Sequence, residues 1–350
     1  MYESRLPRNG SDNTSGEGGP MDLSTVKPMY VRMSLRIVPA ALALLFLLPA
    51  AGKLHAADGE IDWSQVKQRL VSDGVDEQLV DSLFSDPRLE VVPKLLRLNM
   101  KQPDATPSYK RFLEKESIIA TTRFMKKHRK RIERALAGTR VDPAIVVAIL
   151  QVESSLGQTT GDYPLMNVYA TLALLDSDQR DKADPKLWDH VLSDLPREER
   201  AAARRTVRER ARRKGRWAYR QLKALCLMSD KGFDPFEARG SWAGAYGLPQ
   251  FLPTSLEAYG RDGNQDGRID LASIEDAAAS IANYLEVHQY RSDQPAKRRK
   301  AVWNYNHSDE YVDCVLNLAA RVAAESGMGA ESWGKSQAVK EQEAGRDTGE

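Results

Sequence analysis

One apolar stretch, VDPAIVVAILQVESSLG at residues 141–157, constrains the fold more than any other part of the chain. Asp142 is a good N-cap residue and Pro143 suits the first helical position, so a helix is expected to begin here. Apolar side chains then recur at helical spacing, which predicts a helix that faces the core. Glu153 lies on this apolar stripe, four residues after Ile149. Its side chain is therefore expected to point at the core or at a cleft.

A carboxyl group in apolar surroundings loses hydration, and its pKa rises. Glu153 could then hold a proton near neutral pH, which a general acid for glycosidic bond cleavage needs. The alternative is a structural role, in which a buried Glu153 is paired with a backbone donor or an arginine. This segment alone does not decide between the two interpretations.

The N-terminal part is expected to be a disordered extension followed by an export signal. Residues 1–28 are rich in Gly, Ser, Pro and Asn, which is typical of disorder or of a mis-assigned start codon upstream. Ile37–Leu48 is an apolar run that follows two arginines and leads into small residues, the layout of a secretory signal. An uncleaved N-terminal anchor is the alternative, and either one exports the remainder. Cleavage is expected after one of three residues, Gly52, Ala56 or Ala57.

The rest of the chain reads as mainly α-helical, with no repeat. A long helix is expected over Ser108–Leu136, with Phe112, Ile119, Phe124 and Ile132 inside. The expected parts are 1–57 (extension and signal), 58–138 (N-terminal α-helical region), 139–326 (core) and 327–350 (disordered tail).

Charge and cysteine content name no partner or reactive group. Lys and Arg total 51 and Asp and Glu total 49, so the net charge of +2 favours no particular ligand. The Arg-rich stretch within Leu187–Leu227 is interpreted as a surface helix, or alternatively as a face attracted to anionic cell-wall or phospholipid groups; export argues against nucleic acid. Cys226 and Cys314 could form a disulfide in an oxidising compartment or stay buried as free thiols.

A second informative stretch is GSWAGAYGLPQFLP at residues 240–253. Its small residues allow a backbone to approach a ligand closely, its aromatic side chains suit sugar stacking, and Gln250 offers both a donor and an acceptor. Tight helix packing is the alternative. Pro253 is expected to begin another helix.

The segment DGNQDGRID at residues 262–270 fits the first nine positions of a calcium loop. Oxygen ligands stand at positions 1, 3 and 5, and Gly267 makes the turn at position 6. The usual Glu at position 12 is Ser273, so Asp276, in the first turn of an expected helix over Ile274–His288, is the candidate replacement. A hydrated turn without metal is the alternative.

Together these motifs resemble the membrane-bound lytic transglycosylase B family of bacterial murein-cleaving enzymes, glycoside hydrolase family 103. The resemblance covers residues 62–322 and depends on the order of its motifs. They are VESSLG with Glu153, NVYATL at 167–172, GSWAGAYGLPQFLPTS at 240–255, DGNQDGRID with Asp276, ANYL at 282–285 and YNHS at 305–308.

The resemblance implies a lysozyme-like α-helical core over 139–326, joined to an N-terminal α-helical domain, with an EF-hand-like calcium loop beside the cleft. By motif position Glu153 matches the catalytic acid/base. The residues that match glycan-holding positions are Ser241, Gln250, Tyr284, Tyr305, Asn306 and Tyr311. Those that match structural calcium ligands are Asp262, Asn264, Asp266, Arg268 through its carbonyl, and Asp276.

Three departures from the family pattern stand out. ESSLG at 153–157 lacks the bulky aromatic residue that the family usually has before the glycine. Only Glu286 to Asn304 separate ANYL from YNHS, where relatives often insert a small β-domain. The basic region 176–222, in contrast, looks enlarged.

The expected activity is cleavage of the β-1,4 bond between N-acetylmuramic acid and N-acetylglucosamine in peptidoglycan, with 1,6-anhydromuramyl ends. Hydrolytic glycosidases normally need two carboxylates, and the motifs supply one, Glu153. A hydrolytic muramidase on the same fold and a non-catalytic murein-binding scaffold are the alternatives. The expected location is the periplasm, with proteins of cell-wall synthesis or remodelling as candidate partners and no organic cofactor.

Overall fold

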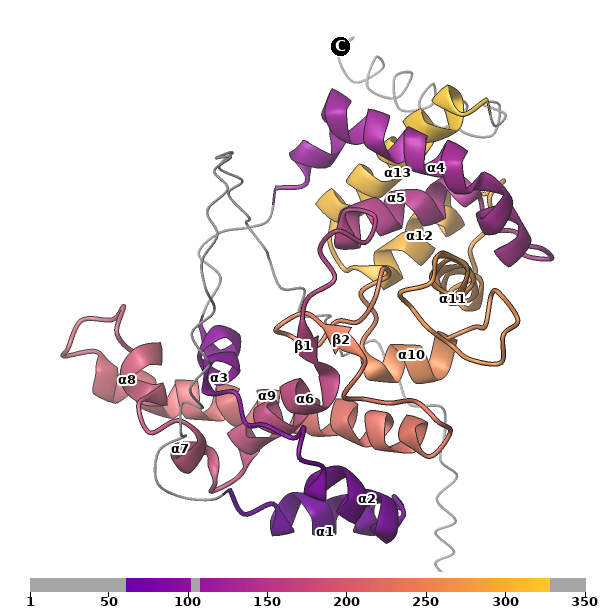
Figure 1. The fold of residues 1–350 in the computed structure, drawn as a ribbon. Coiled ribbons are helices and arrows are strands. Elements are labelled where there is room, and N and C mark those ends of the chain that lie inside the picture. Colours follow the sequence, from indigo (N-terminus) through magenta and orange to yellow (C-terminus); the bar gives the residue numbers. More distant parts are fainter. Residues whose placement is uncertain (1–60, 102–107, 328–350) are drawn as a thin grey trace, which may run out of the picture. The chain divides into compact units, whose positions relative to one another are not determined.

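Helices make up most of the described residues, which are 61–101 and 108–327 of a computed structural model (Figure 1). The predicted mainly α fold is confirmed. The predicted signal or anchor and the predicted tail from residue 328 on lie outside the described residues. The helices are α1 (Ser64–Ser72), α2 (Glu77–Ser85), α3 (Pro93–Met100), α4 (Lys115–Ala135), α5 (Pro143–Ser154), α6 (Leu165–Ala173), α7 (Arg180–Ala183), α8 (Leu187–Val191), α9 (Arg200–Ser229), α10 (Pro253–Tyr259), α11 (Ile274–Val287), α12 (Pro295–Tyr305) and α13 (Asp309–Glu325), with short 3-10 helices at Lys110–Leu113 and Leu174–Asp176.

Helix α5 is deeply buried and packs against both α4 and α13 (Figure 1). Every residue from Ala144 to Gln151 is buried, as expected of a helix that is apolar on all sides. The helix begins as predicted, with the Ile145 amide donating to the Asp142 carbonyl (3.0 Å). The Asp142 side chain makes no capping bond, and its carboxylate accepts from the Tyr290 hydroxyl (2.6 Å).

The predicted long helix before α5 is split, and its buried face differs from the prediction. A 3-10 turn holds the buried Phe112, and α4 then starts anew after Glu114 in extended backbone. That break resets the helical register, so Ile118 is buried and Ile119 is 43% exposed. The placement of Ile119 inside was therefore wrong.

Helix α9 changes character along its length. Its first half exposes most of its arginines, in agreement with the surface helix that the sequence predicts. Its second half packs along α6 and α10 and buries Ala218, Leu222 and Leu225. Both cysteines are buried free thiols, one of them on this helix.

A two-stranded antiparallel sheet brings the 240–253 stretch beside the end of α5. Strand β1 (Tyr163–Pro164) pairs with β2 (Arg239–Gly240), with Tyr163 opposite Gly240. The Ser154 hydroxyl, at the end of α5, donates to the Leu248 carbonyl (2.8 Å) and ties the two segments together. None of the helices in the described part of the chain is long and apolar enough to cross a membrane.

Candidate active site

Glu153 lies in the last turn of α5, which ends at Ser155 in the left-handed conformation (φ 50°). The residue is half-buried, and its Oε1 accepts a hydrogen bond from the Tyr311 hydroxyl (2.7 Å). Burial raises the pKa of Glu153 to about 8, and the Tyr311 hydrogen bond opposes this rise. The carboxyl group therefore holds a proton at neutral pH, as the sequence predicted for a general acid.

Three tyrosines from three helices form an aromatic row that ends at this carboxyl. The rings of Tyr311 on α13 and Tyr305 on α12 are stacked, 6.4 Å apart and 6° from parallel. Tyr284 on α11 meets the Tyr305 ring edge-on at 5.0 Å. Backbone carbonyls anchor the row, since Tyr305 donates to Pro249 O (2.6 Å) and Tyr284 donates to Asn304 O (2.7 Å).

The 240–253 stretch contributes Ser241 and Gln250, and both side chains stabilise the loop. Ser241 is buried, and its Oγ accepts from the amides of Ala243 (3.3 Å) and Ala245 (3.1 Å). Gln250 has a positive φ (51°). Its side-chain Nε2 donates to Gly247 O (2.8 Å) and, over a longer distance, to Thr160 O (3.3 Å). These bonds leave the Ser241 hydroxyl hydrogen and the Gln250 Oε1 as groups that a ligand could use.

Asn306 leads to a residue that the sequence did not single out, Tyr109. The Asn306 amide lies 3.5 Å from the Tyr109 hydroxyl, and the Tyr109 ring meets the Tyr311 ring edge-on at 5.6 Å. Tyr109 sits in an irregular segment before a 3-10 turn and belongs to no motif. Its partners are about 200 residues away, so no local signal could have identified it.

The predicted calcium loop is held by backbone hydrogen bonds to its acidic side chains. Asp262 accepts from the amides of Gln265 (2.6 Å) and Gly267 (2.8 Å). Asp276 is fully buried and accepts from the amides of Gly263 (2.9 Å) and Asp270 (2.7 Å), which joins the loop to the start of α11. The side-chain Oδ1 of Asn264 accepts from the Asp266 backbone amide, and the Asp266 carboxylate accepts from the Arg268 backbone amide.

The residue types of this loop fit a hard cation, because every candidate donor is an oxygen. Within residues 61–101 and 108–327, no group of three or more His, Cys, Asp or Glu side chains is placed to hold a metal ion.

Comparison with known proteins decides the family. A family model described as "Transglycosylase SLT domain" matches residues 59–302. This chain belongs to that family. Its sequence is also 27% identical over 189 residues to the membrane-bound lytic murein transglycosylase B of Escherichia coli K12. That match covers 53% of this chain and 43% of the relative, so the chain spans less than half of the relative's length.

Solved structures of SLT relatives share the fold. The soluble lytic transglycosylase SltB1 of Pseudomonas aeruginosa is 21% identical, with a TM-score of 0.58 over 75% of this chain and 99% of its own. The Escherichia coli lytic transglycosylase Slt35 in complex with calcium is 21% identical, with a TM-score of 0.55 over 75% and 92%. SltB3 of Pseudomonas aeruginosa in complex with NAG-NAM-pentapeptide is 20% identical, with a TM-score of 0.57 over 77% and 79%. The predicted lysozyme-like helical fold is thereby confirmed.

The hydrogen bond between Tyr311 and Glu153 predicts a change in pH dependence. A general acid works while protonated, so if Glu153 has that role, activity should fall as pH rises through its pKa of about 8. In Tyr311→Phe the bond that lowers this pKa is gone, so the alkaline loss of activity should move to higher pH. The rate at neutral pH should also fall about fivefold, because a hydrogen bond contributes about 1 kcal/mol.

The measurement is the pH profile of peptidoglycan turnover for both proteins. Tyr219→Phe is the matched control, since it removes a hydroxyl that donates to Asp73 elsewhere in the molecule (2.9 Å). An alkaline limb that stays in place in Tyr311→Phe would contradict the prediction.

Proposed function

We propose that this protein is a lytic murein transglycosylase. It cleaves the β-1,4 bond between N-acetylmuramic acid and N-acetylglucosamine in peptidoglycan and leaves 1,6-anhydromuramyl ends. Membership of the SLT family and the likeness to the Escherichia coli murein transglycosylase support this activity.

The observation that carries the proposal is a single protonated carboxyl, Glu153, in the last turn of α5. Its pKa responds to burial and to Tyr311, and among the described residues no second carboxylate acts on it. A hydrolytic glycosidase of the retaining type needs a second carboxylate about 5–5.5 Å away. One carboxyl that acts first as acid and then as base suits transglycosylation better.

In the proposed reaction Glu153 donates its proton to the glycosidic oxygen, and the bond from that oxygen to the muramyl anomeric carbon breaks. The N-acetyl group of the same sugar stabilises the cationic intermediate. The Glu153 carboxylate then takes the proton of the muramyl 6-hydroxyl, whose oxygen bonds to the anomeric carbon. Glu153 ends protonated, and no water is consumed.

The residues around Glu153 would hold the glycan. Tyr284, Tyr305 and Tyr311 present an aromatic row on which sugar rings could stack. Ser241, Gln250 and Asn306 would supply polar contacts to the N-acetylated sugars. Tyr311 would also orient the Glu153 carboxyl through their hydrogen bond.

The test of this function is an assay of reducing ends. Purified sacculi are incubated with the protein, and released sugar is compared with newly formed reducing ends. Transglycosylation releases soluble fragments without new reducing ends, since the anhydro ring closes the anomeric carbon. Reducing ends that rise in step with release would identify a hydrolytic muramidase instead.

We also propose that the protein binds a structural calcium ion through Asp262, Asn264, Asp266, Asp276 and the Arg268 carbonyl. The oxygen-only donor set and the calcium complex of the Slt35 relative support the ion. The ion would fasten the loop to α11, the helix that carries Tyr284. Calcium should therefore act on stability more than on chemistry.

Removal of calcium is expected to lower the melting temperature, and calcium should restore it better than magnesium does. An ion that binds only the folded state adds about 2.7 kcal/mol to the free energy of unfolding at a hundredfold excess over its Kd. Asp266→Ala should abolish the response, while Asp230→Ala, at an exposed acid after α9, should keep it. A melting temperature that changes neither with chelator nor with added calcium would refute the proposed calcium site.

The domain boundaries and the location are part of the same proposal. Residues 58–138 would form the N-terminal helical region and 139–326 the catalytic core, which includes the basic region 176–222. The protein would act in the periplasm after export by its N-terminal signal, or at the membrane if the signal is retained.

A further inference from the structure

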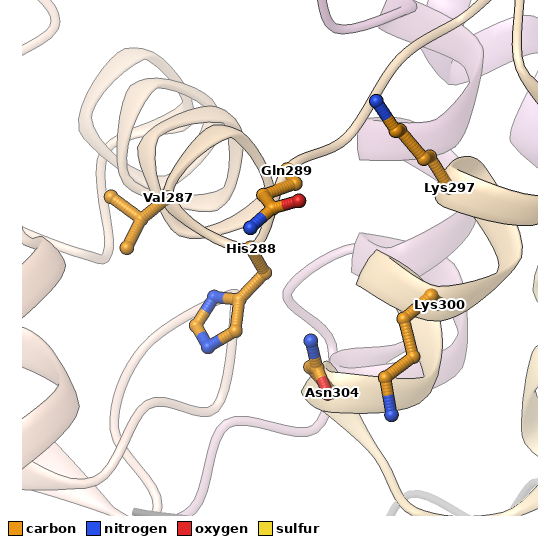
Figure 2. A pocket seen from close by; sticks show the side chains of 6 residues that line it. All are labelled: Val287, His288, Gln289, Lys297, Lys300 and Asn304. Atoms are coloured by element: carbon orange, nitrogen blue, oxygen red, sulfur yellow. The ribbon is translucent and has the colours of Figure 1, made fainter.

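A pocket of about 290 Å³ lies between the end of α11 and the face of α12 (Figure 2). It opens beside the short connection between these two helices, which joins Val287 to Pro295. None of its lining residues is acidic. They are Val287, His288, Gln289, Lys297, Lys300 and Asn304.

The two lysines of this pocket carry charge that the protein does not neutralise. They belong to the run Lys297-Arg298-Arg299-Lys300 on α12, in which both arginines are engaged. Arg298 is buried and donates to Ser292 O, and Arg299 pairs with two carboxylates of α13. Lys297 and Lys300 are exposed, and no acidic side chain of the described residues forms an ion pair with either one.

The spacing of the lysines puts both on one side of the helix, because residues three apart are neighbours on a helical surface. Lys300 also places its ammonium 4.0 Å from the centre of the Trp303 ring. Two cations beside an acid-free pocket favour an anionic ligand.

The pocket shares a wall with the aromatic row of the candidate active site. The His288 ring stacks on Tyr284 (4.2 Å, 21°), and its Nδ1 lies 2.7 Å from the Tyr284 carbonyl oxygen. Because a carbonyl only accepts, Nδ1 carries the hydrogen. On the opposite wall, the backbone carbonyl oxygen of Asn304 accepts a hydrogen bond from the Tyr284 hydroxyl. A ligand in the pocket would therefore lie next to a glycan held by Tyr284.

We propose that this pocket binds a carboxylate of the peptide stem that peptidoglycan carries on its muramyl residues. The inference rests on the proposed function. The N-acetylated sugars of such a strand are uncharged, so its anionic groups are the carboxylates of the peptides. Lys297 and Lys300 would pair with one of them, and the polar groups of Gln289 and Asn304 would bind the adjoining amide.

The test compares two substrates that differ only in charge. One is a soluble peptide-bearing glycan strand, and the other is the same strand after its carboxylates have been converted to amides. For Lys297→Gln/Lys300→Gln, kcat/KM on the native strand should fall about five- to tenfold, because exposed ion pairs are individually weak. On the amidated strand this variant should match the wild type.

The matched control is Lys126→Gln/Lys130→Gln, which removes two exposed lysines from α4. It should leave kcat/KM on both strands unchanged. Equal losses in the control and the pocket variant would indicate general charge attraction and overturn the proposal. Equal losses on native and amidated strands, or no loss at all, would overturn it too.

Binding measurements separate this inference from the proposed function. The Kd of the native strand is measured by titration with the inactive Glu153→Gln protein, with and without the two lysine changes. If the wild type turns the strand over but the two lysine changes leave the Kd unaltered, the proposed function is supported and the pocket proposal is refuted. A lysine-dependent Kd without any turnover by the wild type would support the pocket and refute the function.

Discussion

Glu153→Gln is expected to lower turnover of peptidoglycan by about 10²–10⁴-fold, the range that general acid catalysis contributes. Glutamine has the same shape and can still accept the hydrogen bond from Tyr311, so the end of α5 should stay intact. The amide cannot donate a proton to the glycosidic oxygen or take one from the 6-hydroxyl. Turnover is measured as release of soluble muropeptides from sacculi, and glycan binding is measured separately and should be retained.

Glu257→Gln makes the same chemical change on an exposed face of α10 and should keep full activity. Melting curves give a second comparison, because the folded pKa of about 8 lies above the unfolded value of about 4.3. The folded state therefore binds more protons between these values, and the stability due to Glu153 is lost as pH rises through that window. This part of the pH dependence should disappear in Glu153→Gln. Activity within about tenfold of wild type would remove Glu153 from the acid/base role.

Gly244→Ala is expected to lower the free energy of unfolding by about 2–4 kcal/mol, from left-handed backbone strain and from overpacking. Gly244 has a φ of 89°, and an added Cβ would lie 2.3 Å from the Tyr169 hydroxyl oxygen. Tyr169 cannot move away, since it is fully buried and donates its hydroxyl to Gly244 O (2.7 Å). Denaturant unfolding of the variant and the wild type gives the difference.

Gly232→Ala separates the two causes. Gly232 has the same φ of 89°, but an added Cβ would meet nothing within 4 Å. Its variant should lose only the backbone part, about 1–2 kcal/mol. Equal losses at both glycines would show that contact with Tyr169 does not limit the residue at position 244.

Local patterns in the sequence were sufficient for the starts of three helices and for the direction of the candidate acid. The start of α5, the start of α10 at Pro253 and the first residue of α11 were all predicted from capping and periodicity. Glu153 could be identified because its apolar stripe lies within one helix, so helical spacing alone fixes its direction.

Contacts between distant segments could not be predicted in this way. The Tyr311 hydroxyl reaches Glu153 across 158 residues, and the Tyr169 ring that excludes a side chain at Gly244 lies 75 residues away. For the same reason the sequence could not decide whether the glycines of 240–253 allow a ligand to approach or allow tight packing. At Gly244 the close contact with Tyr169 shows that packing requires a glycine. In α4 a single break in the helix changed the register and misplaced Ile119.

The most direct test of the account is digestion of purified sacculi in water labelled with heavy oxygen, with mass analysis of the released muropeptides. Internal ring closure by the muramyl 6-hydroxyl predicts 1,6-anhydromuramyl products that are one water lighter than hydrolysis products and carry no label. Products that gain one labelled oxygen at the muramyl reducing end would contradict the account, because water would then be the nucleophile.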